Sequence, residues 1–289
     1  MFLVTGANGE LFGRPVLDQL RRLAPEADIV AGTRDPGSAA GLAATGVRVR
    51  RVDFDDPASL ASAFEGATSV LINGTNYGTP AERRAGQHAV AIRAAVEAGV
   101  GRIVYTSWPD PDLYPLPIMS DFVESEALLR SLSADATIVR TTYGLAHTVG
   151  RDVTTAMASG TLAAPAGRAR TAPAHIDDLA EATARVLVSD EHRGNLYTLT
   201  ASDSIDWTDL AALAAATTGK PIDYRPVTDD EFAATVAAQG FPADLVDILL
   251  GVYRAFRAGW TSTPTDDLAT ILRRPPKRAA EAVAAVITA

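Results

Sequence analysis

Short apolar runs alternate along this chain with segments in which apolar residues recur every three or four positions. The run Phe2–Val4 is the length of a buried strand, and Leu17, Leu20 and Leu23 follow it at helical spacing. Similar runs predict further strands at residues 28–34, 47–54, 69–74, 102–107 and 136–141. Helical patterns lie between them, at about residues 37–45, 57–64, 80–98 and 119–132. This order predicts an α/β fold, a doubly wound parallel (Rossmann) sheet with helices on both faces.

The pattern changes after Tyr143. Residues 144–175 are rich in Ala, Gly and Thr, and only a short helix at about 152–158 is expected there. Further helices at 175–188 and 204–213, strands at 195–200 and 220–227, and a mainly helical end follow. We therefore predict a Rossmann domain at residues 1–150. A smaller α/β, mostly helical lobe at residues 151–289 is interleaved with it, over the carboxyl edge of the sheet.

Three glycines, Gly6, Gly9 and Gly13, come directly after the first strand and before a helix. This layout lays a diphosphate across a helix N-terminus, where free backbone N–H groups and the helix dipole attract the anion. The third glycine is displaced by one residue from the usual Gly-x-Gly-x-x-Gly spacing, and an ordinary turn that binds nothing is the alternative. We expect the turn to bind a dinucleotide through Thr5, Gly6, Ala7, Asn8, Gly9, Glu10, Leu11 and Phe12.

Composition narrows the classes of function. Apolar residues make up 47% of the 289, enough for a sizeable core, and the net charge of −9 without a basic block argues against nucleic acid as a partner. The absence of cysteine excludes disulfides and thiolate catalysis, and the four histidines lack metal-ligand spacing. No apolar run approaches the length of a membrane span, and no signal peptide is expected before the first strand. A cytoplasmic protein is therefore expected.

The second predicted strand ends in Thr33 and Arg34. A site that prefers NAD has an acidic residue here for the ribose 2′-hydroxyl, whereas an arginine can pair with the 2′-phosphate of NADPH. The alternative is a solvated arginine that Asp35 neutralises. We predict NADPH as the cofactor, with Thr33 and Arg34 in contact with it and Arg14 as a second candidate for the phosphate.

Several motifs occur in order along the chain: Thr5–Gly9, Thr33–Pro36, Asp53–Pro57, Gln87-His88, Gly101–Ser107 and Ile176–Ala180. Together they resemble the NmrA-like group of atypical short-chain dehydrogenase/reductases. Within that group the chain looks most like the NADPH:quinone oxidoreductases, which are relatives of triphenylmethane reductase. The resemblance covers essentially the whole chain, and it implies an NAD(P)H-dependent oxidoreductase.

The resemblance and the strand ends together suggest further ligand contacts. Cofactor contacts are expected at Asp53, Phe54, Asn73, Gly74, Thr75, Thr106, Thr142, Tyr143 and Gly144. Ser107 and Tyr143 are the candidate catalytic groups, because a hydroxyl beside the nicotinamide can hold a carbonyl oxygen of the substrate. The alternatives are helix capping for Asp53 and Phe54, turn chemistry after the fourth strand, a strand-end cap for Ser107 and a satisfied core hydroxyl for Tyr143.

The catalytic pair Tyr-x-x-x-Lys of ordinary short-chain dehydrogenases is absent. No tyrosine has a lysine four residues later, and the lysines are Lys220 and Lys277. Hydride transfer to a quinone needs positioning more than a tuned acid, because water can protonate the resulting oxyanion. Such chemistry fits a chain that lacks the pair, and the resemblance therefore implies an NADPH-dependent reductase of a quinone or another conjugated carbonyl acceptor.

A flat, apolar acceptor suits aromatic walls. Aromatic residues gather in the expected substrate region: Trp108, Tyr114, Phe122, Tyr143, Phe241, Tyr253, Phe256 and Trp260. Core packing is favoured for Phe256 and Trp260, and Trp108, Phe122 and His147 are the predicted substrate contacts. Packing is expected for His88, a helix start for His175, and solvated positions for Glu124 and Glu126.

Two other functions stay open. One is a non-catalytic redox sensor that binds NAD(P) and regulates a partner, and the other is a pathway-specific reductase of a ketone or enone. A homodimer is one assembly that the sequence allows.

Overall fold

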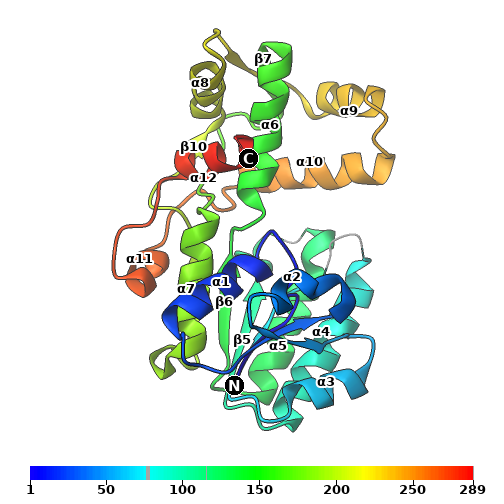
Figure 1. The fold of residues 1–289 in the computed structure, drawn as a ribbon. Coiled ribbons are helices and arrows are strands. Elements are labelled where there is room, and N and C mark those ends of the chain that lie inside the picture. Colours follow the sequence, from blue (N-terminus) through cyan, green and yellow to red (C-terminus); the bar gives the residue numbers. More distant parts are fainter. Residues whose placement is uncertain (76–78, 115, 289) are drawn as a thin grey trace. The chain divides into compact units, whose positions relative to one another are not determined.

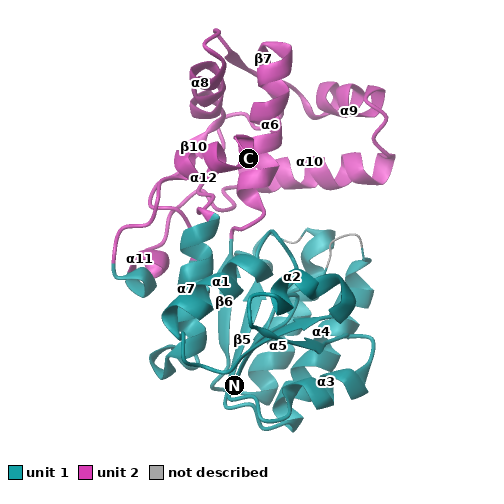
Figure 2. Cartoon of the chain, in the orientation of Figure 1, with its two compact units in different colours: residues 1–141, 176–198, 270–273 teal, residues 142–175, 199–269, 274–289 magenta. Residues whose placement is uncertain are grey.

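The computed structural model describes residues 1–75, 79–114 and 116–288 (Figure 1). The chain separates into two compact units, each of which draws on several stretches of sequence (Figure 2). The first unit holds residues 1–141, 176–198 and 270–273, and the second holds 142–175, 199–269 and 274–289.

A seven-stranded sheet forms the centre of the first unit, in the order β3-β2-β1-β4-β5-β6-β9. The registered neighbours β1 to β6 all pair in parallel, as predicted. Strands β2 and β3 are added on one side of β1, and β4 and the later strands on its other side. Doubly wound folds bind ligands at this switch in strand order. The strands are β1 (Phe2–Val4), β2 (Ile29–Thr33), β3 (Arg48–Arg51), β4 (Ser69–Ile72), β5 (Arg102–Ser107), β6 (Thr137–Thr141) and β9 (Leu196–Leu199).

Helices cover both faces of this sheet because its central strands are buried along their whole length. Ser69 donates a hydrogen bond to the carbonyl of Leu187 in α7, on one face. Tyr105, in register with Ile72, points to α4 on the other face. The helices of the first unit are α1 (Gly13–Leu23), α2 (Ala40–Ala43), α3 (Pro57–Phe64), α4 (Ala81–Glu97), α5 (Ser120–Leu132) and α7 (Ile176–Val188).

The helix predicted at residues 37–45 is shorter than expected. A 3₁₀ turn at Pro36–Ala39 precedes the four-residue α2, since small residues there offer little apolar surface to a neighbouring element. The start of α3 follows its sequence signals, with Asp56 accepting hydrogen bonds from the backbone N–H groups of Ala58 and Ser59 and with Pro57 in the first turn.

The second unit is mostly helical and contains two small sheets, β7 with β11 and β8 with β10. Its first helix, α6, is twice as long as the segment predicted at 152–158. Glycine and threonine hide the pattern, but Gly150 lets α6 approach α12, where an added Cβ would lie 3.2 Å from Val286. The elements are α6 (Leu145–Ser159), β7 (Thr161–Ala164), β8 (Arg170–Thr171), β10 (Ile205–Asp206), α8 (Trp207–Thr218), β11 (Asp223–Pro226), α9 (Asp229–Ala238), α10 (Ala243–Arg257) and α12 (Ala279–Ile287); α11 (Asp267–Leu272) crosses the division between the units.

A buried aspartate and an aromatic cluster form the core of the second unit. The indole N–H of Trp207 donates to Asp152 at 2.8 Å, and the hydroxyl of Tyr253 donates at 2.7 Å. Phe256 and Trp260 stack beside them, so their predicted packing role is confirmed. Tyr253 was expected in the substrate region, and this is wrong: the ring is buried and burial raises the pKa of its hydroxyl far above the ordinary value.

The predicted strand at 195–200 is β9, and it lies beside β6 in the first unit: the backbone N–H of Ile138 donates to the carbonyl of Asn195. The predicted domain boundary at residue 150 falls within α6, while the units themselves divide after Thr141. In the described parts of the chain, no helix combines the length and hydrophobicity that crossing a bilayer requires.

Candidate functional site

The glycine turn after β1 is a tight structure despite its displaced third glycine. Gly6 has a φ of +61°, and its carbonyl accepts from the backbone N–H of Gly9 at 2.9 Å. A Cβ on Gly13 would lie only 2.1 Å from the same carbonyl oxygen. Gly13 therefore allows the start of α1 to press against the turn, which is the close-packing role expected of the third glycine.

Between Asn8 and Leu11 this turn exposes backbone N–H groups, not all of which are paired within the described structure. Asn8, Gly9, Glu10 and Leu11 are exposed, and Leu11 keeps 54% of its surface in contact with solvent. Among the described residues, the backbone N–H groups of Asn8, Glu10 and Leu11 have no acceptor. Phe12 is buried and precedes the first turn of α1. Free backbone N–H groups just before a helix form an anion site.

Arg34 is an exposed cation directly after β2, while Thr33 beside it is buried. Within the described ranges, no carboxylate forms an ion pair with Arg34. The carboxylate of Asp35 instead accepts from the backbone N–H of Gly37 at 2.9 Å, so the neutralising role considered for it is not observed. Arg14 has a weak partner, with its Nε 3.5 Å from Asp18.

The residues after β3 are held in place by local contacts. Asp53 accepts from the backbone N–H of Asp55 at 3.1 Å, and Asp56, rather than Asp53, caps α3. Phe54 is buried, and its ring lies edge-on to the ring of His88 at 6.4 Å. Phe54 therefore joins the wall of the site to helix α4.

Three predicted contacts meet where β1, β4 and β5 end. The backbone N–H of Asn73 donates to the hydroxyl of Thr5 at 2.8 Å. The hydroxyl of Thr106 donates to Asn73 Oδ1 at 2.9 Å and accepts from the backbone N–H of Gly74 at 3.3 Å. These bonds fix the backbone that follows β4, so Asn73, Gly74 and Thr106 lie together. Residues 76–78, which follow this segment, lie outside the described residues.

Ser107 differs from these neighbours. Its side chain is 1% exposed, and its hydroxyl has no hydrogen-bond partner in the part of the chain that the structure describes. A buried hydroxyl without a partner is uncommon and is available to a ligand. Trp108, the next residue, and Phe122 in α5 are both mostly buried, so each presents only a small edge to solvent.

His88 packs in the core as predicted, but it also has hydrogen bonds that the sequence did not suggest. The backbone N–H of Thr75 donates to Nε2 at 3.2 Å, and Nδ1 lies 3.0 Å from the hydroxyl of Tyr105 and 3.2 Å from that of Ser125. Desolvation, aided by the charge of Arg84, lowers the pKa of His88 to about 4. The ring is therefore neutral at ordinary pH.

A buried ion pair supports this histidine. Arg84 in α4 donates to both carboxylate oxygens of Asp121 in α5, at 3.1 and 2.6 Å. Both side chains are almost fully enclosed. Desolvation raises the pKa of Asp121, although Arg84 opposes the shift. Gln87-His88 in the sequence motif was the only available sign of this network, whose other partners come from α5.

Glu126 was expected to be solvated, and this is wrong, whereas Glu124 is exposed as predicted. Glu126 is buried and accepts from Arg140 Nε at 3.0 Å and Nη2 at 2.9 Å. Arg140, in β6, also donates to Asp110 at 2.9 Å. Asp110 has a φ of +43°, which is strained for a residue with a Cβ, so this ion pair holds the loop that follows β5.

The remaining predicted residues belong to the second unit. Thr142 is buried, and its hydroxyl donates to the carbonyl of Leu199 at 3.1 Å and accepts from the backbone N–H of Ala174 at 2.9 Å. Tyr143 and Gly144 are half-buried just before α6, and His147 is exposed on its first turn. His175 directly precedes α7, and its Nδ1 lies 3.2 Å from Lys277 Nζ.

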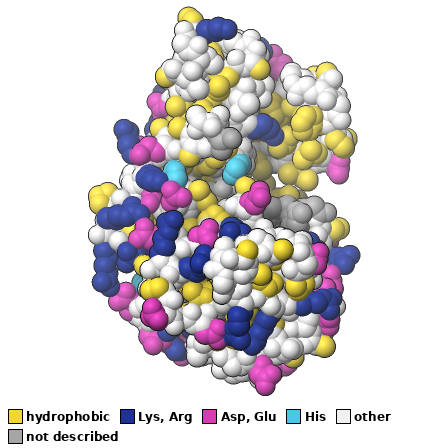
Figure 3. Space-filling model, viewed as in Figure 1, with side chains coloured by type: hydrophobic (Ala, Val, Ile, Leu, Met, Phe, Trp, Pro, Cys, Tyr) yellow, Lys and Arg dark blue, Asp and Glu magenta, His cyan; other side chains and the backbone are white. Residues whose placement is uncertain are grey.

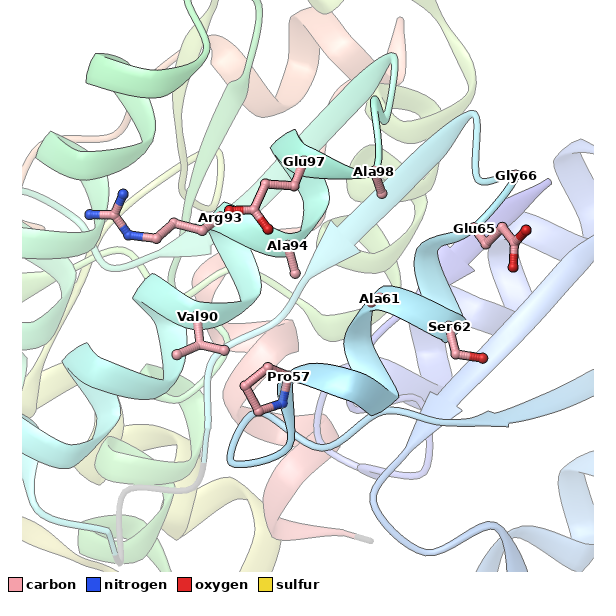
Figure 4. A pocket seen from close by; sticks show the side chains of 10 residues that line it. All are labelled: Pro57, Ala61, Ser62, Glu65, Gly66, Val90, Arg93, Ala94, Glu97 and Ala98. Atoms are coloured by element: carbon pink, nitrogen blue, oxygen red, sulfur yellow. The ribbon is translucent and has the colours of Figure 1, made fainter.

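The surface adds little to this picture. Figure 3 shows both signs of charge interspersed over the face drawn. A hollow of about 650 Å³ lies between α3 and α4, with small residues such as Ala61, Ala94 and Ala98 in its wall (Figure 4). None of its lining residues is a predicted ligand contact. Among the described side chains, no group of histidines and carboxylates could hold a metal ion.

The parallel sheet, its reversal at β1 and the glycine turn define a doubly wound protein of the Rossmann class. Residues 1–258 match the model of the NmrA-like family, and the chain belongs to this family, as its sequence motifs suggested. Quinone oxidoreductase 2 of Escherichia coli strain K12 is 32% identical over 284 residues, which cover 98% of this chain and 97% of the relative.

Solved structures are similar over their whole length. An NADPH-dependent quinone oxidoreductase from Escherichia coli, complexed with NADPH, superposes with a TM-score of 0.89 at 31% identity and 99% coverage of both chains. Triphenylmethane reductase of Citrobacter sp., complexed with NADP(H), gives a TM-score of 0.91 at 27% identity, again with 99% coverage of both.

Proposed function

We propose that this protein is an NADPH-dependent reductase that transfers hydride to a quinone or another conjugated carbonyl acceptor. One observation carries the proposal: among the described residues, the backbone N–H groups of residues 8, 10 and 11, after β1, have no acceptor, and Arg34, after the neighbouring strand β2, has no ion-pair partner. These groups suit a diphosphate and a 2′-phosphate. The names of the similar proteins, two of which were crystallised with this cofactor, support it.

The residues present fit such a cofactor along the carboxyl ends of the strands. The turn from Thr5 to Phe12 would hold the diphosphate, and Thr33 and Arg34 the phosphorylated ribose. Asp53 and Phe54 would flank the adenine. The segment Asn73–Thr75, with Thr106, would support the nicotinamide half. In the second unit, Thr142, Tyr143 and Gly144 stay predicted contacts.

When bound, the cofactor supplies a hydride to the acceptor. The contribution of the protein is to orient that acceptor and to stabilise the developing oxyanion. The hydroxyl of Ser107, which has no hydrogen-bond partner among the described residues, can donate a hydrogen bond to the carbonyl oxygen. Water then provides the proton, since the chain has no Tyr-x-x-x-Lys pair. Tyr143 is a second candidate donor, and Trp108, Phe122 and His147 are the proposed contacts of a flat, apolar acceptor.

The test is steady-state oxidation of NADPH, followed at 340 nm, with 1,4-benzoquinone as acceptor. We expect turnover well above the rate without protein, and a lower rate with NADH at equal concentration. A rate equal to the uncatalysed one, in a protein that binds NADPH by calorimetry, would remove the quinone assignment. An enone and imine panel would then identify a ketone or enone reductase.

A redox sensor is the second candidate. One observation favours it: the hydroxyls of Thr106 and Thr142 already donate hydrogen bonds to neighbouring residues, so they are not directed toward a substrate. Tight binding of NADPH with no reduction of any acceptor in the panel would support this function. A partner protein would then have to be found, whereas the enzyme needs only a small molecule.

We further propose that the protein works in the cytoplasm and that its partners are neither nucleic acid nor a membrane. The net charge of −9 and the mixed surface charge support this. Light scattering would test the homodimer that the sequence leaves open.

A further inference from the structure

His88 contacts three of the residues assigned to the cofactor and the acceptor. Its Nε2 accepts from the backbone N–H of Thr75 at 3.2 Å, with the Thr75 hydroxyl at 3.4 Å. Its ring lies 6.4 Å from that of Phe54 and 6.1 Å from that of Phe122, centroid to centroid. One imidazole thus touches the proposed adenine wall, the proposed nicotinamide support and a proposed acceptor contact.

The hydrogen-bond network assigns the tautomer of this ring. Because a backbone N–H can only donate, Nε2 carries no proton and the proton of the neutral ring is on Nδ1. The hydroxyl of Ser125 donates to the carbonyl of Asp121 at 2.6 Å, so its oxygen is free to accept from Nδ1. The hydroxyl of Tyr105 lies at 3.0 Å from the same nitrogen.

The surroundings leave the ring little freedom to rotate. His88 is fully buried, and Tyr105 and Phe122 pack against it. The Arg84–Asp121 ion pair joins α4 to α5 on either side of it. A ring that is held in one position restrains the backbone N–H group to which it is hydrogen-bonded.

We propose that His88 is a positioning residue: through its bond to the Thr75 N–H it fixes the Gly74–Thr75 segment beneath the nicotinamide half of the cofactor. This inference rests on the proposed function. A mobile Thr75 would leave the adenosine half unaffected, because the turn of residues 6–13 and Arg34 lie on other strands. The proposal therefore predicts an effect confined to one half of the cofactor.

The experiment compares the binding of NADPH with that of 2′,5′-ADP, a fragment without the nicotinamide half, by calorimetry. His88→Phe retains an aromatic ring that can pack on Phe54 but removes the nitrogen that accepts the hydrogen bond from Thr75. We expect it to weaken NADPH about tenfold, the loss of one good hydrogen bond, and 2′,5′-ADP less than about twofold. His88→Gln, whose amide oxygen can reach the Thr75 N–H, should restore NADPH affinity to within about threefold of wild type.

His192→Phe is the matched control. His192 is also buried, and its Nδ1 lies 2.9 Å from the hydroxyl of Tyr197. Its backbone carbonyl, however, accepts from Thr137 at the amino end of β6, away from the carboxyl ends where the cofactor is proposed to bind. Its replacement should lower the melting temperature and leave both affinities unchanged.

Three results would overturn the proposal: unchanged NADPH affinity in His88→Phe, equal losses for NADPH and 2′,5′-ADP, or a His88→Gln variant as weak as His88→Phe. If His88→Phe does not fold, His88→Asn replaces it, because its shorter side chain keeps an acceptor that cannot reach Thr75. Wild-type protein that binds neither ligand would instead refute the proposed function.

Discussion

The carboxyl edge of the sheet has two halves that differ in whether their polar groups are hydrogen-bonded within the described protein. Beyond β1 and β2, the backbone N–H groups of residues 8, 10 and 11 and the guanidinium of Arg34 have no partners among the described residues. Beyond β4 and β5, the side chains of Asn73, Thr106 and His88 bond to one another's segments in a closed network. The two halves meet at Thr5, whose hydroxyl accepts from Asn73.

The contrast separates groups that receive a ligand from groups that shape its site. An unpaired donor at the surface is solvated until an anion replaces the water, so the first half can bind phosphates directly. A satisfied buried network gains nothing from a ligand but holds backbone in one geometry. Ser107 is the exception in the second half, and it is there that we place the acceptor carbonyl.

The largest effect is expected in the first half, for Gly13→Ala. The new Cβ would lie 2.1 Å from the carbonyl oxygen of Gly6, so the turn must move away from α1. We expect about 3 kcal/mol less stability in urea and at least about 100-fold weaker NADPH binding. Gly41→Ala, with nothing within 4 Å of the added atom, is the control. Wild-type affinity in Gly13→Ala would show that the tight turn is not what binds the cofactor.

Arg34→Ala tests the selectivity of the same half. Losing a charge-assisted contact with the 2′-phosphate should weaken NADPH about 30-fold, which is about 2 kcal/mol, and NADH less than about twofold. Fluorescence titration with each cofactor measures both. Arg93→Ala removes another arginine for which no ion pair is found among the described residues, in the wall of the hollow between α3 and α4, and should change neither affinity. Equal losses for NADPH and NADH would mean that Arg34 does not touch the 2′-phosphate.

Lowering the pH should destabilise the folded protein through His88, which belongs to the second half of the edge. Its pKa is lowered from 6.5 to about 4 in the folded protein, so the unfolded chain takes up the proton first as pH falls. Stability that is complete above pH 6.5 is therefore lost progressively toward pH 4, by about 2 kcal/mol between pH 7 and pH 5. The charged groups that face the ring are Arg84 and Asp121, with the Tyr105 hydroxyl beside them.

Urea unfolding at pH 7, 6 and 5 would measure this loss. His88→Gln should lack that part of the slope, while Asp121 and the other carboxylates titrate in both proteins. Identical slopes for wild type and variant would contradict the assignment of this loss to His88.

The smallest effects distinguish two neighbouring hydroxyls. Thr106→Val leaves Asn73 Oδ1 and the Gly74 N–H without a partner and should cost about 1.5 kcal/mol of stability. Ser107→Ala removes a hydroxyl that bonds nothing in the described structure, so stability should stay within about 0.5 kcal/mol of wild type. The turnover of benzoquinone should fall about tenfold in Ser107→Ala. The reverse pattern in stability would show that the two hydroxyls had been assigned to the wrong roles.

Most of the sheet could be predicted because its strands are short apolar runs separated by helical periods. The same reasoning put Asn73 and Thr106 at the ends of the fourth and fifth strands, and the two lie together because carboxyl ends of neighbouring parallel strands share one edge. The length of α6 could not be predicted, because Gly150 and the threonines around it hide a helix that exists through packing on α12. The extent of α2 was overestimated for the opposite reason: alanines favour a helix, but few apolar side chains there anchor one.

Buried polar networks were the part of the site that the sequence did not reveal. Glu126 and Asp121 are charged residues on a helix, and such residues are usually solvated. The burial of Glu126 depends on Arg140 in strand β6, and that of Asp121 depends on Arg84 in helix α4. The sequence does not state such pairings, since no local pattern links the partners. Tyr253 was misplaced in the same way, because its partner Asp152 is 101 residues away.

The late position of β9 in the chain has a consequence for synthesis on the ribosome. When β6 emerges, the strand that covers its outer edge has not been translated, and more than fifty residues must follow first. During that interval β6 is an unprotected edge in a nascent chain, open to pairing with other polypeptides. A pause in translation after β6 has left the ribosome and before β9 has done so should therefore promote aggregation, whereas a pause after β9 has left it should not.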